Sequence, residues 1–242
     1  MIIDNDMHKI DDKLAKVTAR IHQAAAAAGR NPQTVQLIAV SKTQPAAAIA
    51  EAHAWGQRAF GENYLQEALD KQIALQTLPE LEWHFIGPIQ SNKTRPIAAH
   101  FGWVHSVDRL KIAQRLSEHR PDGLPPLNIC VQVNIDDETT KSGISLADLP
   151  TLAAAIQPLP RLQLRGLMAI PAATNNPAQQ CAAFAKLRNA FEALNAQGYG
   201  LDCLSMGMSG DMEAAIAEGA TFVRVGTDIF GARASQHNNF LT

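Results

Sequence analysis

The 242-residue chain is poor in cysteine, in net charge and in long apolar runs, and each shortage excludes a class of protein. Its three cysteines, Cys130, Cys181 and Cys203, are an odd number without CxxC spacing, which is typical of reduced, packed thiols. With 21 basic and 23 acidic residues the formal net charge is −2, so no basic field attracts nucleic acid or anionic lipid. The histidines lack the spacing of a metal motif such as HExxH, which argues against a metal site.

The chain also shows no export or membrane signal. The first residues, MIIDNDMHKIDDK, are too polar for the apolar core of a secretory signal, and no apolar stretch approaches the length of a membrane span. The composition, 46% apolar and 18% charged, is that of an ordinary globular protein. We therefore expect a cytoplasmic monomer that binds neither membranes nor nucleic acids.

What the chain does contain is a regular alternation of short apolar runs and helical patterns. Helical spacing over residues 8–28 predicts an N-terminal helix that Gly29 ends. Eight apolar runs follow, each before a helix or a helical turn: LIAVS, RAFGE, EWHFIG, WVHSV, LNICVQVNI, LRGLMAI, CLSMG and FVRVG. Because parallel neighbours need crossover connections, this alternation predicts parallel strands with helices outside them.

Eight such units in about 200 residues favour an α/β fold, a single (β/α)8 TIM-type barrel. We place the barrel at about residues 35–233 and expect residues 1–242 to form one domain with a short C-terminal tail. A doubly wound open sheet is the alternative.

Lys42 lies where the first predicted strand ends, in AVSKTQP, with the same parity as Ile38 and Val40. Barrel proteins carry their active groups at this end of the strands. A lysine held beside apolar walls can lose its proton and attack a carbonyl to form a Schiff base. A lysine that merely extends to solvent is the alternative.

Two further segments suit an anion. In SMGMSGDME, residues 205–213, glycines and serines precede a helix, so backbone N–H groups and a hydroxyl can surround a phosphate. Ser209 as a simple N-cap is the alternative there. Arg224 lies in the apolar run FVRVG, where a buried guanidinium needs a partner, either a ligand or a carboxylate. Gly226 and Thr227 follow, where backbone amides can reach the same phosphate.

An aldehyde that carries a phosphate satisfies all three segments, and pyridoxal phosphate (PLP) is the commonest such ligand. The segments AVSKTQP, FGENYLQEA, WHFIGPIQSNKTRPI, KSGI, GLMAI, LSMGMSGDMEAAIAEGAT and VRVGTDIFGAR closely resemble the pyridoxal phosphate homeostasis proteins, also called the YggS/PROSC family. The resemblance implies a barrel like the N-terminal domain of alanine racemase (fold type III), holding PLP as a Schiff base. Two small departures, Ile89 where leucine is more usual and Gly210 where alanine or aspartate is frequent, leave the site intact.

The resemblance also implies seven cofactor-binding residues: Lys42, Asn63, Met206, Ser209, Arg224, Gly226 and Thr227. Lys42 would form the Schiff base and Arg224 would contact the pyridine nitrogen. Ser209, Gly226 and Thr227 would hold the phosphate, and the remaining two would lie near the ring.

Three other residues have no assigned function. Tyr64 and Lys141 lie in motifs of the family, and His84 in WHFIG is expected to be a hydrogen-bonded core residue rather than a catalytic one. We expect no catalytic residue and no metal ligand.

The resemblance favours a non-enzymatic carrier that maintains intracellular PLP, the vitamin B6 cofactor, with PLP-dependent apoenzymes as recipients. One alternative is a fold type III enzyme acting on amino acids, such as a racemase, and weak racemase activity stays open. Such an enzyme would need a second domain bringing an acid/base tyrosine, whereas this chain continues only to Thr242 after VRVGTDIFGAR. Another is a barrel aldolase whose Lys42 binds a sugar phosphate without cofactor, which the yellow colour of bound PLP would distinguish.

Overall fold

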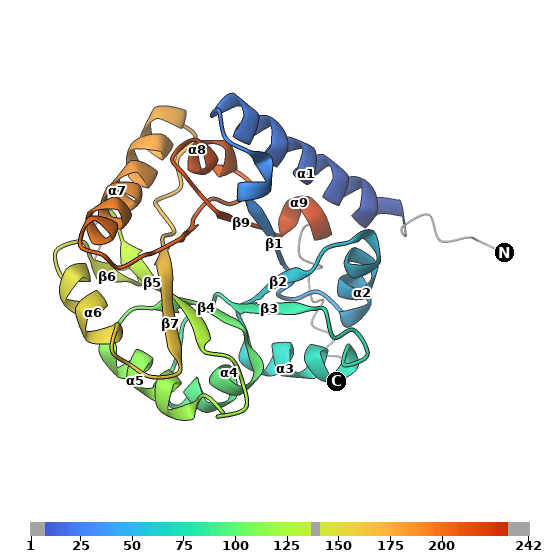
Figure 1. Ribbon diagram of the computed structural model, residues 1–242. Helices are drawn as coiled ribbons and strands as arrows, with labels where there is room; N and C mark the ends of the chain where they lie inside the picture. The colour runs from blue at the N-terminus through green and yellow to red at the C-terminus, as the bar shows by residue number, and fades with distance from the viewer. Residues whose placement is uncertain (1–7, 137–140, 232–242) are drawn as a thin grey trace, which may run out of the picture.

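Eight parallel strands form a closed barrel in the computed structural model, which describes residues 8–136 and 141–231 (Figure 1). The barrel strands are β1 (Gln36–Val40), β2 (Ala59–Glu62), β3 (Glu82–Phe85), β4 (Trp103–Val107), β5 (Leu127–Asn134), β7 (Leu162–Met168), β8 (Cys203–Ser205) and β9 (Phe222–Val225). They are hydrogen-bonded in the order β4-β3-β2-β1-β9-β8-β7-β5, and β4 also pairs with β5. That last pairing closes the ring, which confirms the predicted barrel and excludes the open sheet.

Helices surround the ring of strands (Figure 1). They are α2 (Ala46–Trp55), α3 (Leu65–Ala74), α4 (Thr94–His100), α5 (Leu110–His119), α6 (Leu149–Ile156), α7 (Pro177–Ala196), α8 (Met212–Ala217) and α9 (Thr227–Phe230), with 3-10 turns η1 (Pro32–Thr34) and η2 (Ser91–Lys93). Sequence patterns missed β6 (Ile144–Ser145), which pairs with β5 outside the ring. Two residues are too few for a periodicity.

One helix is additional to the barrel repeat. Helix α1 (His8–Ala27) precedes the first strand and packs against α2, α8 and α9 (Figure 1). Its Leu14, Val17 and Ile21 are buried on one face, as the helical spacing predicts. The predicted N-terminal helix is confirmed, and Gly29, at φ 67°, adopts the left-handed conformation that commonly ends helices.

Apolar side chains fill two layers. The larger cluster lies between strands and helices, and a smaller one inside the barrel contains Cys130 and Cys203 with Trp103 and Phe222. Burial raises the pKa of the Cys130 thiol, and raises that of Cys203 to about 12, so both are protonated at neutral pH. The thiols are therefore packing groups.

The proposal that residues 1–242 form one domain extends beyond the described residues. The expected C-terminal tail and the last two residues of VRVGTDIFGAR lie outside them. Within the described ranges, no helix is long and apolar enough to cross a membrane.

Candidate functional site

A cavity of about 280 Å³ opens at the carboxyl ends of the strands, close to the lower limit of about 300 Å³ for small-molecule pockets. Its lining residues are Val40, Lys42, Asn63, Ile86, Ile170, Met208, Ser209, Gly210, Arg224, Gly226 and Thr227. They lie in or just after strands that are far apart in sequence but adjacent in the ring, such as β1 and β9. Six of the seven residues expected from the sequence thus lie around one cavity.

Met206 is the exception. It is fully buried and belongs to the cluster between strands and helices, together with Leu204 and Ile216. Side chains alternate along a strand, so Met206 lies on the opposite face from Ser205, which contacts Arg224. The structure therefore does not bring Met206 to the cavity; Met208 lines it instead.

Arg224 is the buried cation of the site, with 4% of its surface exposed. Its guanidinium donates from Nη1 to Ser205 Oγ (2.8 Å) and from Nη2 to the Ala169 carbonyl (3.0 Å). Burial lowers its pKa to about 10, so it stays charged at neutral pH. Among the described residues no carboxylate lies within ion-pair distance of the guanidinium, although the more distant charge of Asp211 acts against the fall in its pKa.

A polar chain runs from Arg224 through the barrel interior. Ser205 Oγ lies 2.8 Å from His105 Nδ1, and His105 Nε2 lies 2.9 Å from His84 Nδ1. His84 Nε2 then faces Glu82 Oε2 at 3.4 Å, a contact too poorly aligned to be a hydrogen bond. Burial lowers the pKa of both imidazoles, that of His105 well below its usual value, so both are neutral.

One assignment of protons satisfies this chain. Arg224 donates to the Ser205 hydroxyl, which donates to His105 Nδ1, and the Nε2–H of His105 donates to His84 Nδ1. The remaining Nε2–H of His84 then lies beside the Glu82 carboxylate without a hydrogen bond to it. His84 is thus a hydrogen-bonded core residue, stacked on the ring of Trp103.

A second polar cluster lies between the barrel and α3 and bonds to the residues on either side of Lys42. The Lys71 ammonium is buried and donates to Glu62 Oε1 (2.7 Å), Glu67 Oε1 (2.5 Å) and the Ser41 carbonyl (2.7 Å). Ser41 Oγ donates to the same Glu62 oxygen at 2.6 Å. Glu62 is fully buried, and burial raises the pKa of its carboxyl although Lys71 and Ser41 oppose the rise.

This cluster also holds the residue after Lys42. Glu67 Oε1 accepts a hydrogen bond from the Thr43 N–H (2.6 Å). Thr43 has φ 64°, a left-handed conformation that costs energy for a β-branched residue and persists only where its surroundings impose it. Lys71 and Glu67 together therefore hold both chain neighbours of Lys42.

The loop after β8 differs from a simple serine cap. The N-cap of α8 is Asp211, whose Oδ1 accepts a hydrogen bond from the Met208 N–H (2.6 Å). Gly207 has φ 96°, and a Cβ there would lie 2.6 Å from the Cβ of Ala215, so only glycine fits this turn. The alternative of Ser209 as the N-cap is wrong, and Ser209 lines the cavity.

Comparisons with known proteins agree on one family. The family model described as "Alanine racemase, N-terminal domain" matches residues 13–234. The pyridoxal phosphate homeostasis protein of Pseudomonas aeruginosa is 67% identical over 94% of this chain and 97% of that protein. The protein of that name from Escherichia coli K12 is 56% identical over 94% of this chain and 98% of that protein. The chain belongs to the family of pyridoxal phosphate homeostasis proteins.

Solved structures agree with membership of the pyridoxal phosphate homeostasis family. PipY of Synechococcus elongatus, solved with PLP bound, is 42% identical with a TM-score of 0.80, covering 92% of this chain and 100% of that chain. Alanine racemase from Corynebacterium glutamicum has a TM-score of 0.68 and 17% identity, covering 92% of this chain and 62% of that one. The second likeness shows the fold alone. The family resemblance read from the sequence motifs is confirmed.

Two residues in motifs of the pyridoxal phosphate homeostasis family lie outside the cavity lining. Tyr64 precedes α3 and is 51% exposed. The Lys141 ammonium donates to Asp136 Oδ2 (2.7 Å), which also accepts a hydrogen bond from the Ala172 N–H (2.6 Å). Burial alone would raise the pKa of Asp136, but these hydrogen bonds outweigh it and lower the pKa.

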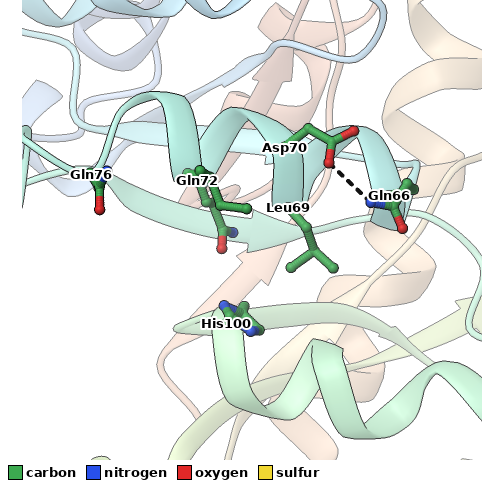
Figure 2. Close-up of a pocket in the computed structure, with 7 residues that line it drawn as sticks. Gln66, Leu69, Asp70, Gln72, Gln76 and His100 are labelled. Atoms are coloured by element: carbon green, nitrogen blue, oxygen red, sulfur yellow. Dashed lines mark hydrogen bonds between the residues drawn. The ribbon is translucent and has the colours of Figure 1, made fainter.

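A larger cavity of about 390 Å³ lies outside the barrel, between α3 and α4 (Figure 2). Its lining residues are Gln66, Leu69, Asp70, Gln72, Ile73, Gln76 and His100. Figure 2 shows Leu69 and Gln72 of α3 pointing toward His100, with Gln66 bonded to Asp70. The lining contains no lysine or arginine, so it suits a phosphorylated ligand less well than the cavity beside Lys42.

Among the residues that the structure describes, no group of three or more histidines, cysteines or carboxylates is arranged to hold a metal ion.

Proposed function

We propose that this chain binds PLP in the cavity beside Lys42, covalently as a Schiff base, and serves in intracellular PLP homeostasis. The observation that carries the proposal is the meeting of Lys42, the buried Arg224 and the Ser209 and Gly226 turns around one cavity. PipY, which is similar over its whole length, was solved with PLP bound. Relatives at 67% and 56% identity carry the name pyridoxal phosphate homeostasis protein.

The chemistry of the cavity fits each part of the cofactor. The aldehyde of PLP reacts with an amine, and Lys42 supplies one at the rim of the cavity. Arg224 uses only some of its N–H groups on Ser205 and Ala169, which leaves donors for the pyridine nitrogen. Asn63 Oδ1 is buried without a hydrogen-bond partner among the described residues, so a ligand donor would satisfy it.

We assign the phosphate to Ser209, Gly226 and Thr227, which we call the phosphate cradle. The Ser209 hydroxyl and the backbone N–H groups of the other two are donors, and charge-assisted bonds to phosphate are the stronger class of hydrogen bond. The backbone of Gly226 lies close to Val40: a Cβ added at Gly226 would be 3.1 Å from the Val40 carbonyl oxygen. Glycine, which has no Cβ, allows this close approach of the two backbones.

We further propose that the protein holds PLP for delivery to apoenzymes and does not turn over amino acids. Arg224 stays charged, because its pKa of about 10 lies above neutral pH. A charged guanidinium donates to the pyridine nitrogen and keeps it unprotonated, which makes the ring a poorer electron sink. The aldolase alternative lacks support from the relatives, whose names concern PLP.

The test is a titration of purified protein with PLP, followed by addition of a PLP-dependent apoenzyme. We expect a visible absorbance band in the wild type that Lys42→Ala lacks, and recovery of apoenzyme activity from the loaded protein. A Lys42→Ala variant with an unchanged band would contradict the covalent assignment. If the wild type shows the band but no apoenzyme activity is recovered, the result would contradict the delivery of PLP but not its binding at Lys42.

A further inference from the structure

We infer that Arg20, on the N-terminal helix α1, is a positioning residue that sets the spacing of the phosphate cradle and the charge around it. The inference rests on the proposed function, since it concerns how tightly the cradle holds a phosphate. Arg20 lies on α1, 189 residues before Ser209 and 208 before Asp228, so no local pattern links it to the site.

The guanidinium of Arg20 contacts the cradle on one side and the residue next to it on the other. Its Nη2 donates to the backbone carbonyl of Ser209 (3.0 Å). Its Nη1 donates to Asp228 Oδ2 (2.8 Å), on the residue that directly follows Thr227 of the cradle. Its Nε donates to Oε1 of Glu213 (2.9 Å), which lies in the first turn of α8.

The cradle needs such a connection because its two halves belong to different strand-loop units. Ser209 follows β8, whereas Thr227 follows β9, and the helices that continue them, α8 and α9, have only six and four residues. Short helices give weak support of their own. One planar side chain that bonds to both loops fixes their separation, as an arginine fork does better than a flexible lysine.

Arg20 also neutralises two carboxylates that lie near the cradle. Glu213 and Asp228 place two carboxylates beside residues that we assign to a phosphate dianion, and unpaired they would repel it. The Arg20 cation pairs with both. The side chain is only partly exposed, at 37%, and its three acceptors form a network rather than an isolated surface pair.

The position of α1 does not depend on this arginine. Leu14, Val17 and Ile21 are buried, and α1 packs against both α8 and α9. A substitution at Arg20 therefore removes the polar fork and leaves the apolar seam. Arg30 offers a matched control: it donates to the carbonyl of Ile216 (2.7 Å), near the other end of α8, and to Thr34, away from the cradle.

The experiment measures the dissociation constants of PLP and of pyridoxal, which lacks the phosphate, for the wild type, Arg20→Ala, Arg20→Lys and Arg30→Ala. Inorganic phosphate serves as a competitor in each titration. We expect Arg20→Ala to lose about five- to tenfold in PLP affinity, with less than about a twofold change for pyridoxal and weaker competition by phosphate. Arg20→Lys should lie between the two, because lysine keeps the charge without the fork. Arg30→Ala should retain the wild-type preference for PLP.

If Arg20→Ala prefers PLP over pyridoxal as strongly as the wild type does, the role of Arg20 is overturned, while the assignment of the cradle stands. An equal loss for PLP and pyridoxal, or the same loss in Arg30→Ala, makes Arg20 an ordinary structural residue and overturns it too. A wild type that binds both vitamers equally contradicts the cradle itself. Should Arg20→Ala not fold, Arg20→Gln, which keeps a polar side chain of similar length without charge, gives the same ratio.

Discussion

Lys71→Met should destabilise the protein strongly, because Lys71 is the cation of a buried cluster. The substitution keeps the length of the side chain and removes three hydrogen bonds, to Glu62, Glu67 and the Ser41 carbonyl. Glu62, which has no exposed surface, is then left without its cation. Breaking a buried ion pair on one side costs about 3 to 5 kcal/mol.

In a protein of this size, about 3 to 5 kcal/mol corresponds to a fall in Tm of about 6 to 20 °C. Differential scanning calorimetry measures it, with Lys111→Met, which removes an exposed lysine on α5, as the control. The double variant Glu62→Gln/Lys71→Met should regain much of the loss, because no buried charge remains unpaired. A fall of less than about 3 °C in Lys71→Met, or no recovery in the double variant, would refute the assignment.

The same variant has a pH signature. Burial already raises the pKa of Glu62, and the loss of the opposing Lys71 bond raises it further. A carboxyl whose folded pKa is raised favours folding when it is protonated, so its contribution is lost as pH rises through that pKa. The gap in Tm between Lys71→Met and the wild type should therefore be wider at pH 8 than at pH 5. A gap independent of pH would contradict an uncompensated carboxylate.

Three further predictions follow from the site. Ser209→Ala should weaken PLP binding by about 1 to 3 kcal/mol in a titration while pyridoxal binds unchanged; equal losses would refute the phosphate contact. Because burial lowers the pKa of His84 and His105, the free energy of unfolding should fall as pH drops below 6.5, and less steeply in His105→Gln, as urea titrations would measure. Deuterium exchange at the α-carbon of L- and D-alanine should stay below about 1 per second, and faster exchange that Lys42→Ala abolishes would indicate an enzyme.

The barrel was predictable because each strand is an apolar run long enough to recognise. The closing pair β4–β5 needed only the count of units and the preference for parallel neighbours. The arginine within β9 stood out because a charged residue is unexpected in a buried strand. The lysine just after β1 stood out because barrel proteins carry their active groups at that end of the strands. Their meeting at one cavity follows from the pairing of β1 with β9.

The rest depended on contacts that local patterns do not encode. The contact of His84 with His105 requires the lateral arrangement of β3 and β4, and Arg20 reaches the cradle from a helix outside the repeat. Family resemblance predicts Met206 near the ring, but Met206 directly follows β8 and is buried with Leu204 in the cluster between strands and helices. The left-handed Thr43 had no signal, because a β-branched residue is a poor candidate for that conformation.

The most direct test of the central claim is the identity of the lysine that binds the cofactor. Borohydride reduction of the PLP-loaded protein, followed by peptide mass mapping, should place a pyridoxyl phosphate group on the peptide that contains Ser41-Lys42-Thr43. The same treatment of Lys42→Ala should leave that peptide unmodified. Modification confined to Lys71 or Lys141, or no modification in the wild type, would contradict the assignment of Lys42.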